Sequence, residues 1–186
     1  MNGGYEIPAL AGERVALRPI TLAESILVQQ WIHESDILTQ TCRPPVIQSA
    51  EEAVERRRER KPSSTQATLA IVLRGTGTIV GQVRYFDVNF RNSAAEIGYV
   101  VAPSARGKAF GREAVSLLLG FLLGGLGMNK AYAQTASFNA ASVKLLESLG
   151  FKRDAVLREH HLYQGKLHDD YVYSILSTEW QARQGS

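Results

Sequence analysis

The residues with the clearest chemical potential are three cations in one loop, Arg106, Lys108 and Arg112. Gly107 and Gly111 in the same loop let the backbone approach a bound group closely. A segment of helical spacing follows, so the loop leads into a helix start, whose amides carry a partial positive charge. This combination predicts a site for phosphate or pyrophosphate. The loop matches neither common glycine-rich phosphate motif, and a tight strand-to-helix turn explains the glycines equally well.

Histidines and carboxylates near the C-terminal end raise the question of a metal site. Neighbouring side chains on a strand point to opposite faces, so His160 and His161 cannot easily share one ion. We expect no metal, and expect this group to flank a substrate site, where a histidine can assist proton transfer. The group consists of His160, His161, His168, Asp169 and Asp170. The lone Cys42 has no evident His-Asn partners, so a nucleophilic role is not expected.

Hydrophobic spacing and end signals divide the chain into short elements. Thr21 with Glu24, and Ser49 with Glu52, have the spacing of capping boxes, so each pair predicts the start of a helix. Gly150 predicts the end of another helix. The predicted helices are 21–32, 49–60, 113–126 and 139–148, and the predicted strands are 14–18, 67–73, 78–87, 94–101, 130–135, 151–160 and 166–176.

The order of these elements indicates the fold class. It reads β-α-α-β-β-β-α-β-α-β-β, in which an antiparallel meander precedes two strand–helix–strand units. This order argues for a mixed α/β (α+β) sheet. The connections are short, so residues 1–186 are expected to form a single domain with its core in residues 12–180.

Composition narrows the class of protein and its partners. The chain has 186 residues, of which 45% are hydrophobic and 21% charged, as in ordinary globular domains. One cysteine excludes an internal disulfide, and the sequence shows neither a signal peptide nor an apolar run of about 20 residues, so we expect a cytoplasmic protein without membrane contact. The net charge of +3 is small and its densest run, residues 56–60, spreads around a helix, so a nucleic-acid partner is not expected.

Two segments carry a family resemblance. Residues 106–111 resemble the acetyl-CoA loop of the GNAT superfamily of N-acetyltransferases, Arg/Gln-x-x-Gly-x-Gly/Ala, with Ala109 in place of the middle glycine. That alanine suggests a backbone conformation that tolerates a Cβ. Residues 139–151 resemble the superfamily's N-x-x-S…E-x-x-G-F segment. Together with E-I-G-Y and a G-x-x-x-D near residue 165, these motifs resemble the branch that contains the ribosomal-protein acetyltransferases RimJ and RimL.

The resemblance implies a fold and a cofactor site. The fold is a mostly antiparallel sheet of about seven strands with helices on both faces. Acetyl-CoA would place its pyrophosphate on the amides of the loop and its pantetheine arm along the strand ending at Val101, where that strand splays from the one holding Thr135. An N–H near Val101 would polarise the thioester. The implied cofactor-binding residues are Tyr99, Val100, Val101, Arg106, Gly107, Lys108, Ala109, Phe110, Gly111, Arg112, Asn139 and Ser142; Asn139 also suits a helix cap.

The resemblance also implies a reaction, in which an amine attacks acetyl-CoA directly. Glu96 matches the position of the general base in some members, although a structural role explains it too. The tyrosine that many relatives use as an acid is Leu146 here, and another glutamate base is Gln134. Ser142 remains as a proton donor, or as a local hydrogen-bonding residue.

The amine acceptor is less defined. Helices 21–60 and the last strand pair should select it, with Trp31, Arg43 and Tyr163 as lining residues, although core packing explains Trp31 as well. A peptide N-terminal amine is favoured by the branch resemblance. The alternatives are a small amine such as an antibiotic, polyamine or amino sugar, or an acyl-CoA-binding module with weak turnover. The protein is expected to be a monomer or homodimer.

Overall fold

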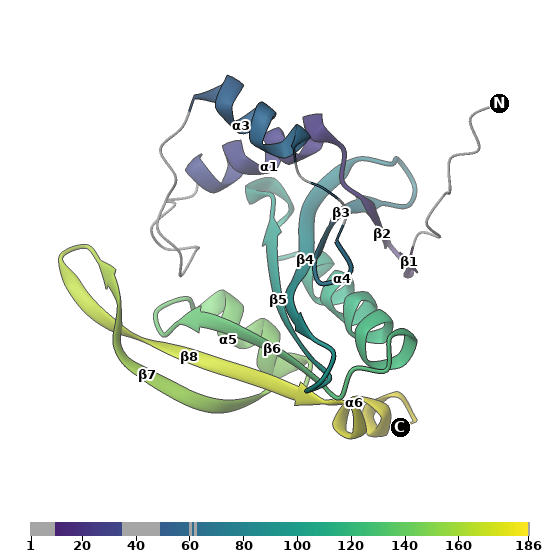
Figure 1. Cartoon of the computed structure of the whole chain (residues 1–186), viewed down its shortest axis with the longest axis vertical. Helices are drawn as coiled ribbons and strands as arrows, with labels where there is room; N and C mark the ends of the chain where they lie inside the picture. Colours follow the sequence, from purple (N-terminus) through teal and green to yellow (C-terminus); the bar gives the residue numbers. More distant parts are fainter. Residues whose placement is uncertain (1–9, 35–48, 60, 62, 186) are drawn as a thin grey trace.

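The computed structural model describes residues 10–34, 49–59, 61 and 63–185, so Cys42 and Arg43 lie outside the described residues. Its elements run from strand to helix much as the sequence predicts (Figure 1). They are β1 Leu10–Ala11, β2 Val15–Pro19, α1 Leu22–Glu34, α3 Ala50–Arg58, β3 Ala67–Leu73, β4 Ile79–Asn89, β5 Ala94–Val101, η1 Pro103–Ala105, α4 Phe110–Leu119, η2 Gly120–Gly125, β6 Lys130–Ala136, α5 Ala140–Ser148, β7 Lys152–Tyr163, β8 Lys166–Leu176 and α6 Ser177–Gln184.

One mixed sheet organises the molecule. The strands lie in the order β1-β2-β3-β4-β5-β6-β8-β7, and every pairing is antiparallel except that of β5 with β6. The predicted fold class is therefore confirmed. The sheet has eight strands, one more than expected, because Leu10–Ala11 adds a two-residue strand to the edge of β2.

Both predicted capping boxes are present. Thr21 Oγ1 accepts a hydrogen bond from the Glu24 amide (3.3 Å), and Glu24 Oε2 accepts one from the Thr21 amide (3.0 Å). Ser49 and Glu52 make the same reciprocal pair at the start of α3. Each box satisfies amides that have no partner within the helix. These starts depend on residues three apart, which is why the sequence alone could locate them.

Both faces of the sheet are covered. Ile71 belongs to the main core with Val115 and Leu118 of α4, all fully buried. Ala70 is also fully buried, and because side chains alternate along a strand, it points to the opposite face. Figure 1 shows α1 and α3 together at one end of the sheet, and α4 and α5 beside the strands that they cover. Burial of each large core side chain contributes about 1.5–3 kcal/mol.

The predicted helix 113–126 differs from the structure at both ends. Helix α4 begins three residues earlier, at Phe110, and after Leu119 the chain continues as the π-helix η2, in which Leu126 donates to the Phe121 carbonyl (2.8 Å). Glycine has a low α-helix propensity, and η2 contains three glycines. The regular α-helix therefore gives way to the wider π-helical turn in this segment. Helix α6, which the sequence did not predict, begins where the Leu176 amide donates to Glu179 Oε2 (3.0 Å).

The pairing of β5 with β6 is short and leaves an opening. Only Ala94–Glu96 pair with Lys130–Tyr132, and beyond this point the two strands run apart (Figure 1). From Ile97 to Val101, β5 pairs with β4 alone among the described strands. One edge of this stretch is therefore available to an extended ligand, as in strand addition.

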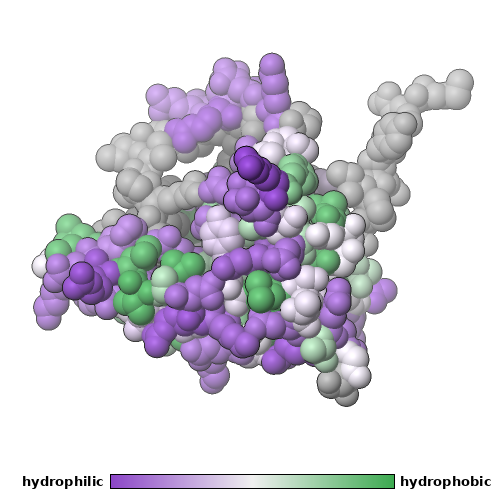
Figure 2. Space-filling view, turned by 60° about the horizontal axis from the view of Figure 1, so that its bottom comes forward, coloured by the Kyte–Doolittle hydropathy of each residue, from purple (hydrophilic) through white to green (hydrophobic). Residues whose placement is uncertain are grey.

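Strands β7 and β8 project from the sheet as a long hairpin (Figure 1). Leu162 and Leu167, which are register partners near its tip, are 66% and 56% exposed. The space-filling view shows green hydrophobic residues interspersed with hydrophilic ones over the end of the molecule that the hairpin forms (Figure 2). No helix in the described part of the chain is long and apolar enough to cross a membrane.

Candidate functional site

The loop before α4 has the features of an anion site. Among the described residues, the backbone amides of residues 107–112 have no hydrogen-bond acceptor, whereas the next amide, that of Glu113, donates to the Ala109 carbonyl (3.2 Å). The side chains of Arg106, Lys108 and Arg112 are exposed beside these amides. Unpaired amides at a helix start and nearby cations together favour a bound phosphate group.

Two residues of this loop have a left-handed backbone conformation. Gly107 has a φ of 74° and Ala109 a φ of 61°. Position 109 therefore carries its Cβ in the left-handed region, where it is tolerated but unfavourable, which the sequence did not predict. Ala109 is the N-cap residue of α4 in the left-handed region, where a Cβ costs roughly 1–2 kcal/mol. The glycine in the family's pattern would be unstrained at this position.

Gly111 lets the start of α4 approach two other elements. A Cβ at this position would lie 3.0 Å from Val101 Cγ2 on β5 and 3.3 Å from Leu145 Cδ1 on α5. Both distances are tight for a Cβ contact, so a side chain at 111 would push the helix start away. The glycine therefore lets the amide-bearing helix start pack closely against the end of β5 and against α5.

Arg106 ties the loop to the end of β5. Its Nε donates to the Val101 carbonyl (3.2 Å), although the side chain is exposed. This bond fixes the direction of the guanidinium while its positive charge remains beside the loop amides. The contact suits the predicted role of Arg106 near a phosphate and adds a structural role.

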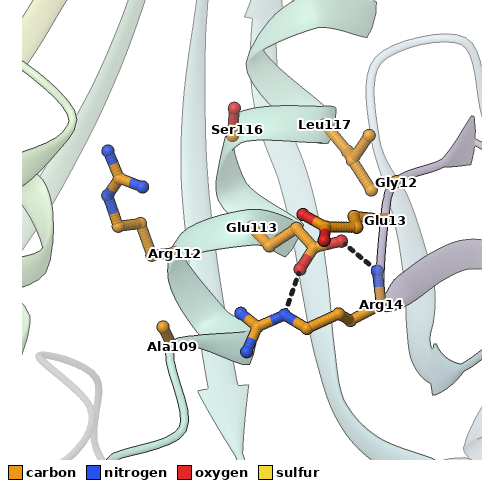
Figure 3. A pocket seen from close by; sticks show the side chains of 8 residues that line it. All are labelled: Gly12, Glu13, Arg14, Ala109, Arg112, Glu113, Ser116 and Leu117. Atoms are coloured by element: carbon orange, nitrogen blue, oxygen red, sulfur yellow. Dashed lines mark hydrogen bonds and ion pairs between the residues drawn. The ribbon is translucent and has the colours of Figure 1, made fainter.

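A partly buried carboxylate, that of Glu113, anchors the other flank of α4 (Figure 3). Glu113 Oε1 accepts hydrogen bonds from the amides of Arg14 (2.8 Å) and Val15 (3.1 Å), and Oε2 accepts one from Arg14 Nε (3.1 Å). A shallow groove of about 570 Å³ lies here, and Arg112 points away from the ion pair within its lining. Sequence reasoning missed Arg14 and Glu113; the only local signal was an acidic residue in the first turn of a helix.

A hydrogen bond between two hydroxyl groups joins β5 to α5, the helix that follows β6. Tyr99 Oη on β5 lies 2.8 Å from Ser142 Oγ on α5. Asn139 is the N-cap of α5, and its Oδ1 accepts a hydrogen bond from the Ser142 amide (3.2 Å). Burial raises the pKa of Tyr99 to about 12, although the bond to Ser142 opposes this change. Tyr99, Asn139 and Ser142 are thus brought together at one place between β5 and α5.

Glu96 lies where the strands diverge. It is the last β5 residue to pair with β6, and its partner there is Tyr132. Burial raises the pKa of Tyr132, and the negative charges of Glu96 and Asp87 raise it further. Two carboxylates therefore lie near Tyr132, where the strands begin to diverge, and their negative charge favours a cationic group nearby.

A buried carboxylate, that of Asp170 on β8, lies opposite the end of β6. Asp170 has no exposed surface; its Oδ2 accepts a hydrogen bond from Gln134 Nε2 (2.8 Å), and its Oδ1 lies 3.5 Å from His161 Nδ1. The His161 ring meets the edge of Phe138, whose neighbour Asn139 caps α5 (centroids 5.3 Å). The sequence placed His161 and Asp170 beside the substrate site but did not predict their contact or the bond to Gln134.

The structure separates the predicted acceptor residues. Trp31 is partly buried and packs against the main core. Tyr163, on the hairpin, stacks on Phe138 (centroids 4.7 Å), and His168 meets the same ring. Arg43 lies outside the described residues. Within the described part of the chain, the His, Cys, Asp and Glu side chains form no cluster of three or more that could hold a metal.

Comparisons with known proteins identify the family. The family model described as "Acetyltransferase (GNAT) domain" matches residues 14–152. The N-acetyltransferase p20 of Bacillus licheniformis is 26% identical over 170 residues, which cover 90% of this chain and 96% of that protein. YdaF of Bacillus subtilis, provisionally described as a ribosomal N-acetyltransferase, is 29% identical over 105 residues, covering 56% and 57%.

A solved structure has the same fold. The spermidine N-acetyltransferase SpeG of Vibrio cholerae, in complex with CoA and spermine, superposes with a TM-score of 0.79. The two chains are 20% identical, and the match covers 91% of this chain and 99% of SpeG.

Proposed function

The chain belongs to the GNAT acetyltransferases, and on this premise we propose that it transfers the acetyl group of acetyl-CoA to a primary amine bound at the opening between β5 and β6. The observation that carries the proposal is the position of this opening. It begins at Glu96, and the amides of residues 107–112, which have no acceptor among the described residues, lie beyond the end of β5 together with the cations Arg106, Lys108 and Arg112. The acetyl-CoA and the amine can therefore both bind along β5, the cofactor from the loop at its end and the amine near Glu96.

The cofactor half of the site uses backbone groups more than side chains. Acetyl-CoA supplies the reactive thioester. The amides of residues 107–112 would hold its pyrophosphate, with Arg106 and Lys108 beside it. The free edge of β5 would pair with the pantetheine arm, and an N–H near Val101 would polarise the thioester carbonyl.

The acceptor half must deprotonate the amine. An amine with a pKa of about 8 to 10 is mostly protonated at neutral pH, so a base has to remove a proton before the nitrogen attacks. Glu96 suits this role because it lies at the point of divergence. The nitrogen bonds to the carbonyl carbon and forms a tetrahedral adduct. When the adduct collapses, the C–S bond breaks, the electron pair stays on sulfur, and the nitrogen loses its second proton to water. Ser142 would donate a hydrogen bond to that sulfur.

Two acceptor classes have support. A peptide N-terminal amine is favoured by the motif resemblance and by the description of YdaF. A polyamine is favoured by SpeG, whose structure holds spermine, and by the negative charges of Glu96 and Asp87 near the opening. We place the peptide amine first because its support comes from sequence motifs rather than from fold alone.

A thiol-release assay tests the proposal. Acetyl-CoA is mixed with the full chain and a panel of peptides, spermidine, spermine, aminoglycosides and amino sugars. Steady thiol release that depends on one class of amine supports the transferase and identifies its acceptor. Saturable CoA binding without release for any amine would instead support a module that binds acyl-CoA without turnover.

A further inference from the structure

We infer that Tyr99 is a positioning residue for Ser142: it donates its phenolic hydrogen to Ser142 Oγ, so that the serine hydrogen points to the leaving sulfur. The inference rests on the proposed acetyl transfer and concerns the departure of the thiolate. It gives a specific task to two hydroxyls that come from opposite arms of the opening.

Tyr99 and Ser142 come from two different elements that meet at the opening. Tyr99 lies three residues beyond Glu96, in the part of β5 that has separated from β6. Ser142 lies in the first turn of α5, the helix that follows β6. Their oxygens are 2.8 Å apart, so the hydrogen bond joins β5 to α5. The Ser142 carbonyl is a second acceptor for Tyr99 Oη, but at 3.4 Å it is the longer and weaker contact. The Asn139 side chain holds the Ser142 amide, which fixes the backbone from which the serine hydroxyl projects.

The number of hydrogens decides what each hydroxyl can do. A serine hydroxyl has one hydrogen and two lone pairs. If Ser142 donated to Tyr99, its only hydrogen would be used within the protein. When Tyr99 donates instead, Ser142 accepts with a lone pair and keeps its hydrogen for a third atom. Donation in series also polarises the serine hydroxyl, which strengthens its bond to a developing anion.

The relative acidities distinguish a hydrogen-bond donor from an acid. A thiol has a pKa of about 8.5, well below the pKa of about 12 that burial gives Tyr99. Full transfer of the phenolic proton to the thiolate is therefore unfavourable. The pair stays protonated and stabilises the charge on sulfur, and the departing thiolate takes its proton from water. This arrangement also explains how the site works with Leu146 at the position where many relatives have a tyrosine.

The contact lies beside the cofactor loop. Tyr99 is two residues before Val101, and Leu145 is three residues after Ser142 on α5. Val101 and Leu145 are the residues that Gly111 approaches. The hydroxyl pair is therefore fixed relative to the helix start that would hold the pyrophosphate, so both ends of the cofactor would be positioned by the same packed elements.

Conservative variants test the inference in the full chain. Tyr99→Phe should lower kcat about 10-fold, as expected for losing one hydrogen bond to a charged transition state. The Kd for CoA should stay within about twofold, because the phosphate contacts remain. Ser142→Ala should lower kcat at least as much, and the double variant should be no slower than Ser142→Ala, since serial groups do not add. Ser142→Thr, which restores a hydroxyl, should recover most of the activity.

Tyr173→Phe is the matched control. Tyr173 Oη also donates to α5, to Glu147 Oε1 (2.8 Å), so its loss loosens the same helix without touching Ser142. We expect its kcat to be unchanged. Equal losses in Tyr99→Phe and Tyr173→Phe, or additive losses in the double variant, would overturn the inference. A wild-type protein that releases no thiol with any amine would refute the proposed function itself.

Discussion

Arg14 and Glu113 are 99 residues apart in sequence, yet they share two hydrogen bonds, one from the Arg14 backbone and one from its guanidinium. Burial of the Glu113 carboxylate opposes its ionisation, but hydrogen bonds from Arg14 and the Val15 amide outweigh this and lower the pKa of Glu113. The pair joins β2 to the first turn of α4, where the amide-bearing loop ends. The loop of residues 106–112 is therefore held by the segment at the start of β2.

Replacing this carboxylate should loosen the loop. Glu113→Gln removes the charge and cannot accept all three donors, so we expect the free energy of unfolding to fall by about 1–3 kcal/mol. CoA binding should weaken several-fold because the helix start is less ordered. Urea unfolding and calorimetric titration with CoA measure the two effects. Glu55→Gln, which alters an exposed ion pair with Arg58, should change neither.

The same pair predicts a pH dependence of stability. The folded-state pKa of Glu113 is lowered, so its contribution is fully present above the unfolded pKa of about 4.3. That contribution is lost as the pH falls from there through the folded-state pKa. The difference in unfolding free energy between wild type and Glu113→Gln should therefore shrink in acid. A constant difference from pH 7 to pH 3 would mean that the carboxylate charge is not the stabilising feature.

Two substitutions of the left-handed Ala109 should change the stability of the protein in opposite directions. Ala109→Gly relieves a strain of roughly 1–2 kcal/mol and adds unfolded-state entropy, so stability should rise by up to about 1 kcal/mol. Ala109→Val should destabilise the protein, because a β-branched residue fits this region worse. Gly107→Ala is the companion variant: its Cβ would meet no atom within 4 Å, so a loss of about 1 kcal/mol there reports backbone strain alone. Thermal unfolding ranks the three.

Arg106 should matter for cofactor binding. Its charge lies beside the loop amides, so Arg106→Ala should raise the Kd for CoA about 10-fold and have a smaller effect on kcat at saturating CoA. The affinity of the variant should also depend less on ionic strength. Arg91→Ala, which removes an exposed arginine from the turn after β4, is the control. An unchanged Kd in Arg106→Ala would remove this residue from the phosphate site.

Glu96 should matter for turnover. Glu96→Gln keeps the size of the side chain but cannot accept a proton, so kcat should fall about 100-fold or more while the Kd for CoA stays near the wild-type value. Asp87→Asn removes the other nearby charge and should cost far less. A pH–rate profile that is the same in wild type and Glu96→Gln would show that another group accepts the proton of the amine.

Local sequence was enough for most of the scaffold. The capping boxes at Thr21 and Ser49 place two helix starts because their hydrogen bonds join residues three apart. Alternation and turn residues placed the strands within a few residues of the observed bounds. The two-residue β1 escaped prediction because it is defined only by its pairing with β2. Helix α6 escaped prediction because its N-cap is Leu176, whose side chain cannot accept a hydrogen bond, so the usual Ser, Thr, Asp or Asn signal is missing.

The features of the candidate site also fall into two groups, those that neighbouring residues encode and those that depend on tertiary contacts. The sequence by itself determined the order of the elements, the basic loop before a helix and the cap at Asn139, because each is encoded by neighbouring residues. Only the tertiary structure decided that Ala109 is left-handed, that Glu113 binds β2, and that Tyr99 meets Ser142 across the opening. The last two contacts join residues 98 or 99 and 43 apart, so they exist only once the sheet and its helices have packed.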